Sequence, residues 1–101
     1  MEEAVCTLAV WRVKPGREAE FIEAWKGLGG IFSKLPLPPG GKGTLVQSLT
    51  DPLLFYSFGA WKSMAAIQAM RQDPTAQQGI KKIGELCTEA TPGSFRVVAE
   101  V

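Results

Sequence analysis

The sequence predicts a small α+β domain of the ferredoxin-like type, with a four-stranded antiparallel sheet and helices on one face. The chain has 101 residues, enough for a single domain, which we expect to span residues 1–101. Its apolar residues switch between the strand period of two and the helix period of 3.6, and turn residues separate the segments. The resulting order is strand, helix, strand, strand, two helices and strand, which is the split βαβ order.

The first strand and the first helix have the clearest patterns. Residues 5–13 are rich in β-branched and aromatic side chains and end at Lys14-Pro15-Gly16, which predicts a strand and a turn. Apolar side chains occupy both of its faces, so we expect packing on each side. Residues 17–34 predict an amphipathic helix, because large apolar side chains recur every three or four residues. These side chains are Phe21, Trp25, Leu28 and Phe32.

The middle of the chain predicts a loop followed by a hairpin. Prolines and glycines between residues 36 and 43 indicate an irregular loop. Residues 44–50 and 53–61 are typical of two strands, and the Asp51-Pro52 turn between them predicts antiparallel pairing.

Two helices and a closing strand complete the predicted fold. Ser63 is a suitable N-cap for a helix over residues 64–72. Asp73-Pro74 breaks this helix, and Thr75 is the expected cap of a second helix that ends near Leu86. After a turn at residues 91–93, residues 94–101 predict the last strand.

The second face of the predicted sheet has no helix to cover it. If Trp61 faces the helices, alternate residues of its strand form an apolar row on the opposite face. An exposed apolar sheet predicts a partner surface, and a two-fold homodimer that packs sheet against sheet would cover it. The expected interface residues are Leu54, Tyr56 and Phe58, with Ala60 at the end of the row.

Composition argues against several function classes. Eleven basic and ten acidic residues give a net charge of +1, so no nucleic-acid footprint is present. No apolar run is long enough to span a membrane, and Met1-Glu2-Glu3 lacks the positive charge of a signal peptide, so we expect a cytoplasmic protein. Cys6 and Cys87 lack metal-ligand spacing and are expected to be reduced, buried thiols. We expect neither a metal nor a cofactor.

Three segments together resemble the antibiotic biosynthesis monooxygenase family, a group of dimeric α+β barrels. They are residues 13–21 with Trp25 after them, the Asp51-Pro52 turn, and residues 58–66, in which Trp61 ends a strand just before a helix. The resemblance implies a homodimer with a pocket between the sheet and the helices of each subunit. It also implies oxygenation of phenolic or quinol-type molecules without a cofactor, or, in one branch, oxidative heme breakdown. Many members of the family have no assigned activity.

Within this resemblance, Trp61 marks the expected site, because an indole can donate a hydrogen bond and stack on an aromatic ligand. Oxygenating relatives have an Asn four residues earlier, where this chain has Ser57, whose hydroxyl has a shorter reach. Arg71 would stabilise a deprotonated substrate oxygen if its helix turns it inward. We therefore expect catalytic roles for these three residues. The expected pocket lining is Thr7, Ala9, Trp11, Phe21 and Trp25.

Heme breakdown is disfavoured, because the sequence contains no histidine to act as axial ligand, and Arg71 lies near the place of that ligand. Two functions stay open. The favoured one is a cofactor-independent monooxygenase or quinol oxidase for a small aromatic ligand. The alternative is a non-catalytic homodimeric ligand-binding or accessory module, in which Trp61 is a packing residue, Ser57 a small filler and Arg71 a surface charge.

Overall fold

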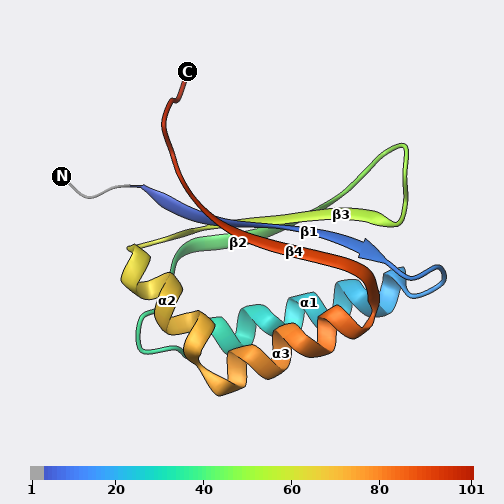
Figure 1. Cartoon of the computed structure of the whole chain (residues 1–101), viewed down its shortest axis with the longest axis horizontal. Helices are drawn as coiled ribbons and strands as arrows, with labels where there is room; N and C mark the ends of the chain where they lie inside the picture. Colours follow the sequence, from blue (N-terminus) through green and yellow to red (C-terminus); the bar gives the residue numbers. More distant parts are fainter. Residues whose placement is uncertain (1–3) are drawn as a thin grey trace.

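A computed structural model describes residues 4–101 as one antiparallel sheet covered on one face by helices (Figure 1). Met1-Glu2-Glu3, the residues that lack the positive charge of a signal peptide, lie outside the described residues. The elements are β1 (Val5–Val13), α1 (Glu18–Ser33), β2 (Pro39–Gln47), β3 (Leu54–Trp61), α2 (Met64–Gln72), α3 (Pro74–Glu85) and β4 (Cys87–Arg96). The strand order β2-β3-β1-β4 confirms the predicted ferredoxin-like fold.

Strand β1 lies inside the sheet, between β3 and β4, and its register decides which side chains face the helices. Every second residue from Val5 points toward the helices, and Trp11 and Val13 are buried there. Thr7 pairs with Gly59 and Ala9 pairs with Ser57, so the same inner face continues onto β3.

The buried residues form two clusters at opposite ends of the space between sheet and helices. The Trp11 cluster consists of Ala9, Trp11, Val13, Phe21, Leu28, Phe55, Ile83, Leu86 and Cys87. The Trp61 cluster consists of Val5, Trp61, Ala66, Ile67, Met70 and Ala76. Ile31, Phe32 and Ile80 are partly buried and pack against both clusters. The core is therefore divided along the sheet.

The helical layer is held by one close approach and two side-chain caps. A Cβ atom added at Gly79 of α3 would lie 3.0 Å from Cδ1 of Ile31, so this glycine lets α3 pack closely on α1. Ser63 Oγ accepts a hydrogen bond from the backbone N–H of Ala66 at 3.1 Å, which confirms the predicted cap of α2.

The predicted cap of α3 is wrong. Asp73, not Thr75, is the N-cap residue, and its Oδ1 accepts a hydrogen bond from the backbone N–H of Ala76 at 2.9 Å. Pro74 then occupies the first helical position, where no backbone N–H is needed.

Both edge strands differ from their predicted bounds. β2 begins at Pro39 rather than residue 44, with a register irregularity between Pro39 and Gly43. β4 begins at Cys87, includes the predicted turn at residues 91–93 and ends at Arg96. An edge strand has one side without ladder bonds, so it tolerates prolines and glycines that indicate turns elsewhere.

Among the described helices, none combines the length and the apolar character needed to cross a membrane.

Candidate functional site

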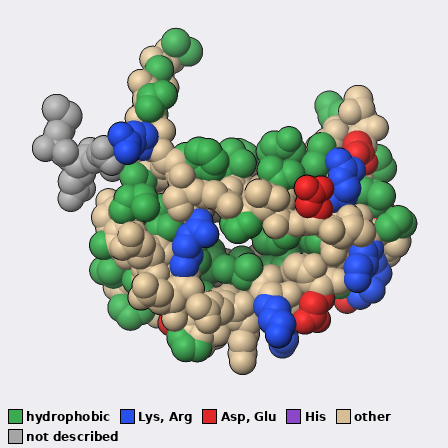
Figure 2. Space-filling model, viewed as in Figure 1, with side chains coloured by type: hydrophobic (Ala, Val, Ile, Leu, Met, Phe, Trp, Pro, Cys, Tyr) green, Lys and Arg blue, Asp and Glu red, His purple; other side chains and the backbone are tan. Residues whose placement is uncertain are grey.

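A cavity of about 710 Å³ lies between the sheet and the helices. Its walls come from all four strands and all three described helices. Figure 2 shows an opening between the two layers, with Lys or Arg side chains near its rim. The volume falls within the range of about 300–1,000 Å³ that is usual for small-molecule sites. The lining is mostly apolar, with a few polar groups among it.

The structure places most of the expected site residues on this cavity, namely Thr7, Ala9, Trp11, Trp25, Ser57, Trp61 and Arg71. Phe21 is the exception. Its ring is fully buried, with centroids 5.7 Å from Trp11 and 4.9 Å from Phe55, so the expectation that it lines the pocket is corrected. The first turns of α1 pack directly on the Trp11 cluster, and the cavity opens only farther along the helix.

Several lining residues were not expected from the sequence. Leu28 and Phe32 belong to the apolar stripe of α1, so the helical period contained a signal for them. Ile80 likewise belongs to the apolar pattern of the last predicted helix. Lys42 and Lys81 had no such signal, because their place depends on how α3 and the irregular start of β2 close around the cavity.

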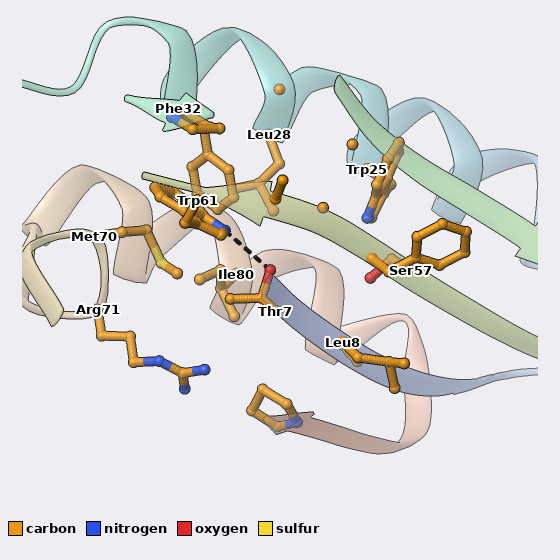
Figure 3. Close-up of a pocket in the computed structure, with 18 of the residues that line it drawn as sticks. Thr7, Leu8, Trp25, Leu28, Phe32, Ser57, Trp61, Met70, Arg71 and Ile80 are labelled. Atoms are coloured by element: carbon orange, nitrogen blue, oxygen red, sulfur yellow. Dashed lines mark hydrogen bonds between the residues drawn. The ribbon is translucent and has the colours of Figure 1, made fainter. Parts of the chain in front are cut away.

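Two tryptophans of the cavity wall donate to hydroxyls on the neighbouring strand. Trp61 Nε1 donates to Thr7 Oγ1 at 3.0 Å, as Figure 3 shows, and Trp11 Nε1 donates to Ser57 Oγ at 2.9 Å. An indole N–H can only donate, so each hydroxyl oxygen is the acceptor and keeps its own proton for another partner. Trp61 therefore orients Thr7 in this structure, and the hydroxyl is the group left to meet a ligand.

Trp25 holds the indole N–H that is free for a ligand. Its side chain is half-buried, and among residues 4–101 this N–H has no hydrogen-bond partner. Figure 3 shows its indole nitrogen turned toward the side of the cavity where Ser57 lies. Gly43 on β2 makes room for the ring, because a Cβ atom there would lie 3.4 Å from Trp25 Cη2.

Arg71 reaches the cavity from the last turn of α2. Its Nη2 donates to Ser94 Oγ on β4 at 3.0 Å, and its backbone carbonyl accepts from Gln77 Nε2 at 2.7 Å. The Nε atom is buried and has no partner among the described residues. Ser94 thus orients one end of the guanidinium, whose Nε keeps unused donor capacity.

The lining offers donors and positive charge rather than an acid–base pair. No Asp or Glu of the described chain lines the cavity, and residues 4–101 contain no cluster of His, Cys, Asp or Glu suited to a metal. Cys87 lies outside the lining, and burial raises the pKa of its thiol, which keeps it protonated. The site can hold an aromatic molecule and stabilise negative charge on it.

No protein-family model matches this sequence, and no curated protein matches it. Solved structures do share the fold. A mutant of SnoaB, a cofactor-independent oxygenase from Streptomyces nogalater, superposes with a TM-score of 0.86 at 17% identity, covering 98% of this chain and 97% of that one. A Bordetella bronchiseptica protein, provisionally described as an antibiotic biosynthesis monooxygenase, superposes with a TM-score of 0.81 at 22% identity. The match covers 99% of this chain and 100% of that one.

A conserved protein from Methanosarcina mazei Go1 gives a TM-score of 0.79 at 19% identity, with 93% and 92% of the two chains covered. Identities this low show the fold and no more than the fold. The chain is similar along nearly its whole length to structures described, some provisionally, as antibiotic biosynthesis monooxygenases, and it shares the fold that its sequence resemblance implied.

Proposed function

We propose that this protein is a cofactor-independent oxygenase or quinol oxidase that acts on a small phenol or hydroquinone bound between sheet and helices. One observation carries the proposal: a mostly apolar cavity of about 710 Å³ whose polar side chains are hydroxyls, indoles, the amide of Gln77 and cations, with no carboxylate in the described lining. The fold of SnoaB, itself described as a cofactor-independent oxygenase, supports it.

The proposed chemistry uses the electrons of the substrate itself. A phenol that releases its proton to the solvent as it binds becomes electron-rich enough to reduce O₂, provided that the protein stabilises the phenolate oxygen. Thr7, Ser57 and Trp25 would supply neutral donors to that oxygen. The positive charge of the lining as a whole, from Lys42, Arg71 and Lys81, would favour the phenolate. The apolar walls would keep water away from the reacting carbon.

Two reactions with O₂ are balanced in atoms and electrons and need only the substrate as the reductant. A hydroquinone gives two electrons and two protons to O₂, which yields a quinone and H₂O₂. Anthrone, the keto tautomer of a three-ring phenol, takes one oxygen atom at its CH₂ carbon to give anthraquinone, and the second atom leaves as water. The site needs no other reductant for either reaction.

The test is oxygen uptake by the purified protein in a chelating buffer, with anthrone and 1,4-dihydroxynaphthalene as substrates. We expect uptake above the uncatalysed rate, and a loss of about tenfold or more in Ser57→Ala and Thr7→Val, which each remove one donor. Lys82→Gln is the control, because Lys82 is exposed and does not line the cavity. No uptake with any phenol of the panel, together with unchanged ligand binding in Trp61→Phe, would lead us to abandon the proposal.

The alternative function is a non-catalytic ligand-binding module, and the same measurements separate the two. Its supporting observation is that two of the three tryptophans in the cavity wall, Trp11 and Trp61, already have hydrogen-bond partners inside the protein, as packing residues do. Ligand binding without oxygen uptake would favour this alternative.

We also propose that a second copy of the chain covers the outer face of the sheet. Tyr56 and Phe58 are exposed on that face, as is Phe95 of β4. Figure 1 shows the C-terminal residues after β4 rising on the same side, away from the helices, and they include the exposed Val98. Apolar side chains on both the face and the tail favour a partner that buries them together.

A further inference from the structure

We infer that the ligand of this cavity is an aromatic carboxylate, and that Arg71 holds its carboxylate on the side bounded by α2, α3 and β4. This inference rests on the proposed function for the position of the ligand site, and it specifies in addition that the ligand is negatively charged. Three observations on the described residues support it: the charged lining residues are all cations, none of them has a carboxylate partner, and the Arg71 guanidinium is hydrogen-bonded to Ser94 while its Nε has no partner.

The charged residues of the lining all have the same sign. They are Lys42, Arg71 and Lys81, and no Asp or Glu of residues 4–101 lines the cavity. The charge of the chain as a whole is nearly balanced, with 11 basic and 10 acidic residues. The charged residues of the lining, in contrast, are all basic. Three cations around one apolar space make it attractive to an anion.

None of these three cations has a carboxylate partner within the described chain. The ion pairs Arg12–Asp51, Arg17–Glu20 and Lys26–Glu23 involve other cations and lie on the surface. The positive charge at the cavity is therefore not neutralised by the protein, and an anionic ligand would not have to displace an internal partner.

Among the three cations, Arg71 is the one whose position favours a directed hydrogen bond to an anion. Ser94 on β4 holds one edge of its guanidinium at 3.0 Å, and Gln77 on α3 holds its backbone carbonyl. Its Nε is buried without a partner, which is unfavourable unless a ligand accepts from it. Figure 3 shows the guanidinium reaching from α2 toward the strands. A planar guanidinium with free N–H groups matches the two oxygens of a carboxylate.

The remaining lining favours an aromatic body for this anion. Trp25, Phe32 and Trp61 supply ring surface, and polar groups are few beside them. The hydroxyls that would hold a ring oxygen lie on β1 and β3, whereas Arg71 comes from α2. One ligand could thus meet the hydroxyls with its ring oxygen and Arg71 with its carboxylate.

The test compares 2-naphthoate with 2-naphthamide by isothermal titration calorimetry. The two molecules have nearly the same size and differ in charge, and neither is a phenol. We expect 2-naphthoate to bind about tenfold tighter or more, and added salt to weaken only its binding. Arg71→Gln should remove the preference, Arg71→Lys should restore part of it, and Lys82→Gln should leave it unchanged because Lys82 is exposed outside the lining.

Equal affinity for the two probes would overturn the inference, and so would an unchanged preference in Arg71→Gln with an intact circular dichroism spectrum. If Arg71→Gln does not fold, the salt dependence and Arg71→Lys still decide. Oxygen uptake on 1,4-dihydroxynaphthalene without a preference for 2-naphthoate would overturn this inference and keep the proposed function. A clear preference without any oxygen uptake would support this inference and remove the proposed reaction.

Discussion

At the scale of single residues, the hydrogen bond from Trp61 to Thr7 ties the cavity wall to the stability of the sheet. The indole is 5% exposed, so its N–H has little access to water if the hydroxyl is removed. Thr7→Val keeps the shape of the side chain and leaves that donor unpaired. We expect it to lower the free energy of unfolding by about 1–3 kcal/mol in a urea titration.

Thr7→Ser is the matched control, because it keeps the hydroxyl that accepts from Trp61 Nε1. We expect the serine variant to recover most of the loss. Equal stabilities of the valine and serine variants would show that the hydroxyl does not carry the effect.

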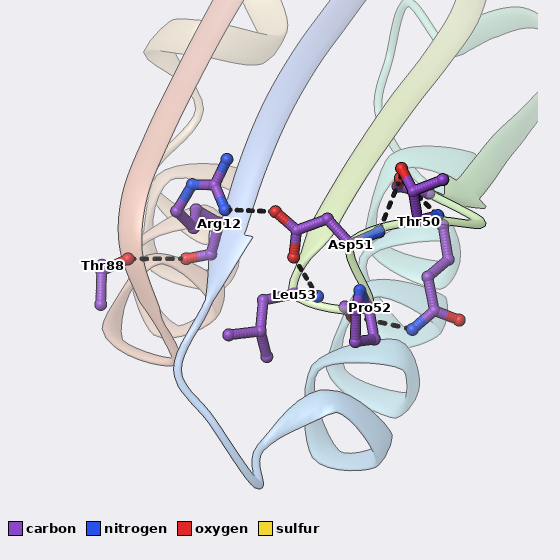
Figure 4. A network of polar contacts seen from close by, with 8 residues as sticks. Arg12, Thr50, Asp51, Pro52, Leu53 and Thr88 are labelled. Carbon is purple, nitrogen blue, oxygen red and sulfur yellow. Dashed lines mark hydrogen bonds and ion pairs between the residues drawn. The ribbon is translucent and has the colours of Figure 1, made fainter.

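A second residue-scale contact joins the hairpin turn to β1. Figure 4 shows Asp51 between the side chain of Arg12, at 2.8 Å, and the backbone N–H of Leu53, at 3.1 Å. The hydrogen bond from Arg12 is the main cause that lowers the pKa of Asp51, and the Leu53 N–H adds to it. The two side chains are 42% and 39% exposed, so solvent and salt screen the pair and its stabilisation is small.

This shift gives a pH prediction with a definite sign. Because the pKa of Asp51 is lower in the folded state, the unfolded chain takes up the proton first as the pH falls. The pair therefore stabilises the fold fully above the usual Asp pKa of about 4, and this contribution is lost as the pH falls through the folded value. The Tm of the wild type and of Asp51→Asn should differ at pH 7 and converge in acid. A gap that stays constant with pH would contradict this account.

At the scale of elements, the strands and helices with a strong period could be predicted, and the edges of the sheet could not. β1, α1 and β3 have apolar patterns that agree with their burial, and the structure confirms them to within a residue or two. β2 and β4 contain the glycines and prolines that indicate loops. Pro92 lies within β4 because an edge position does not require its N–H, and strand order is not visible in a local pattern.

Helix α1 contains glycines whose removal should stabilise the protein. A Cβ atom at Gly27 or Gly29 would meet no atom within 4 Å, and neither residue has a positive φ. Alanine in place of either glycine should raise the free energy of unfolding by about 0.5–1 kcal/mol, because it reduces the backbone freedom of the unfolded chain. Chemical denaturation measures both changes.

The two glycines differ in their relation to the cavity, and this makes them a matched pair. Gly29 lines the cavity and Gly27 does not. Ligand affinity should therefore respond to Gly29→Ala and stay unchanged in Gly27→Ala, while both variants gain stability. An equal effect of the two variants on binding would argue that the ligand does not sit along α1.

At the scale of the whole molecule, the divided core explains why a small domain contains a large cavity. The Trp11 cluster and the Trp61 cluster close the two ends of the layer interface, and only Ile31, Phe32 and Ile80 pack against both. The sequence predicted that Trp61 lies at the cavity, because Trp61 ends a strand just before a helix. It could not predict that Thr7 accepts from Trp61, or that Ser94 accepts from Arg71, since both contacts join elements far apart in the chain.

The outer face of the sheet gives the last prediction, which concerns assembly. Phe58 is 43% exposed there and Tyr56 is 41% exposed, and both belong to the row that the sequence assigned to a dimer interface. If a second copy covers this face, light scattering at micromolar concentration should give about twice the chain mass of 10.9 kDa. Phe58→Glu places a charge on the face and should shift the mass to that of one chain.

Met64→Glu is the matched control for this experiment. Met64 has nearly the same exposure, 41%, but lies at the start of α2 on the helical side. A glutamate there also suits the positive end of the helix dipole, so this variant should fold and keep the mass of two chains. A single-chain mass for the wild type would contradict the dimer. Loss of the two-chain mass in both variants would show that the outer face is not the surface responsible.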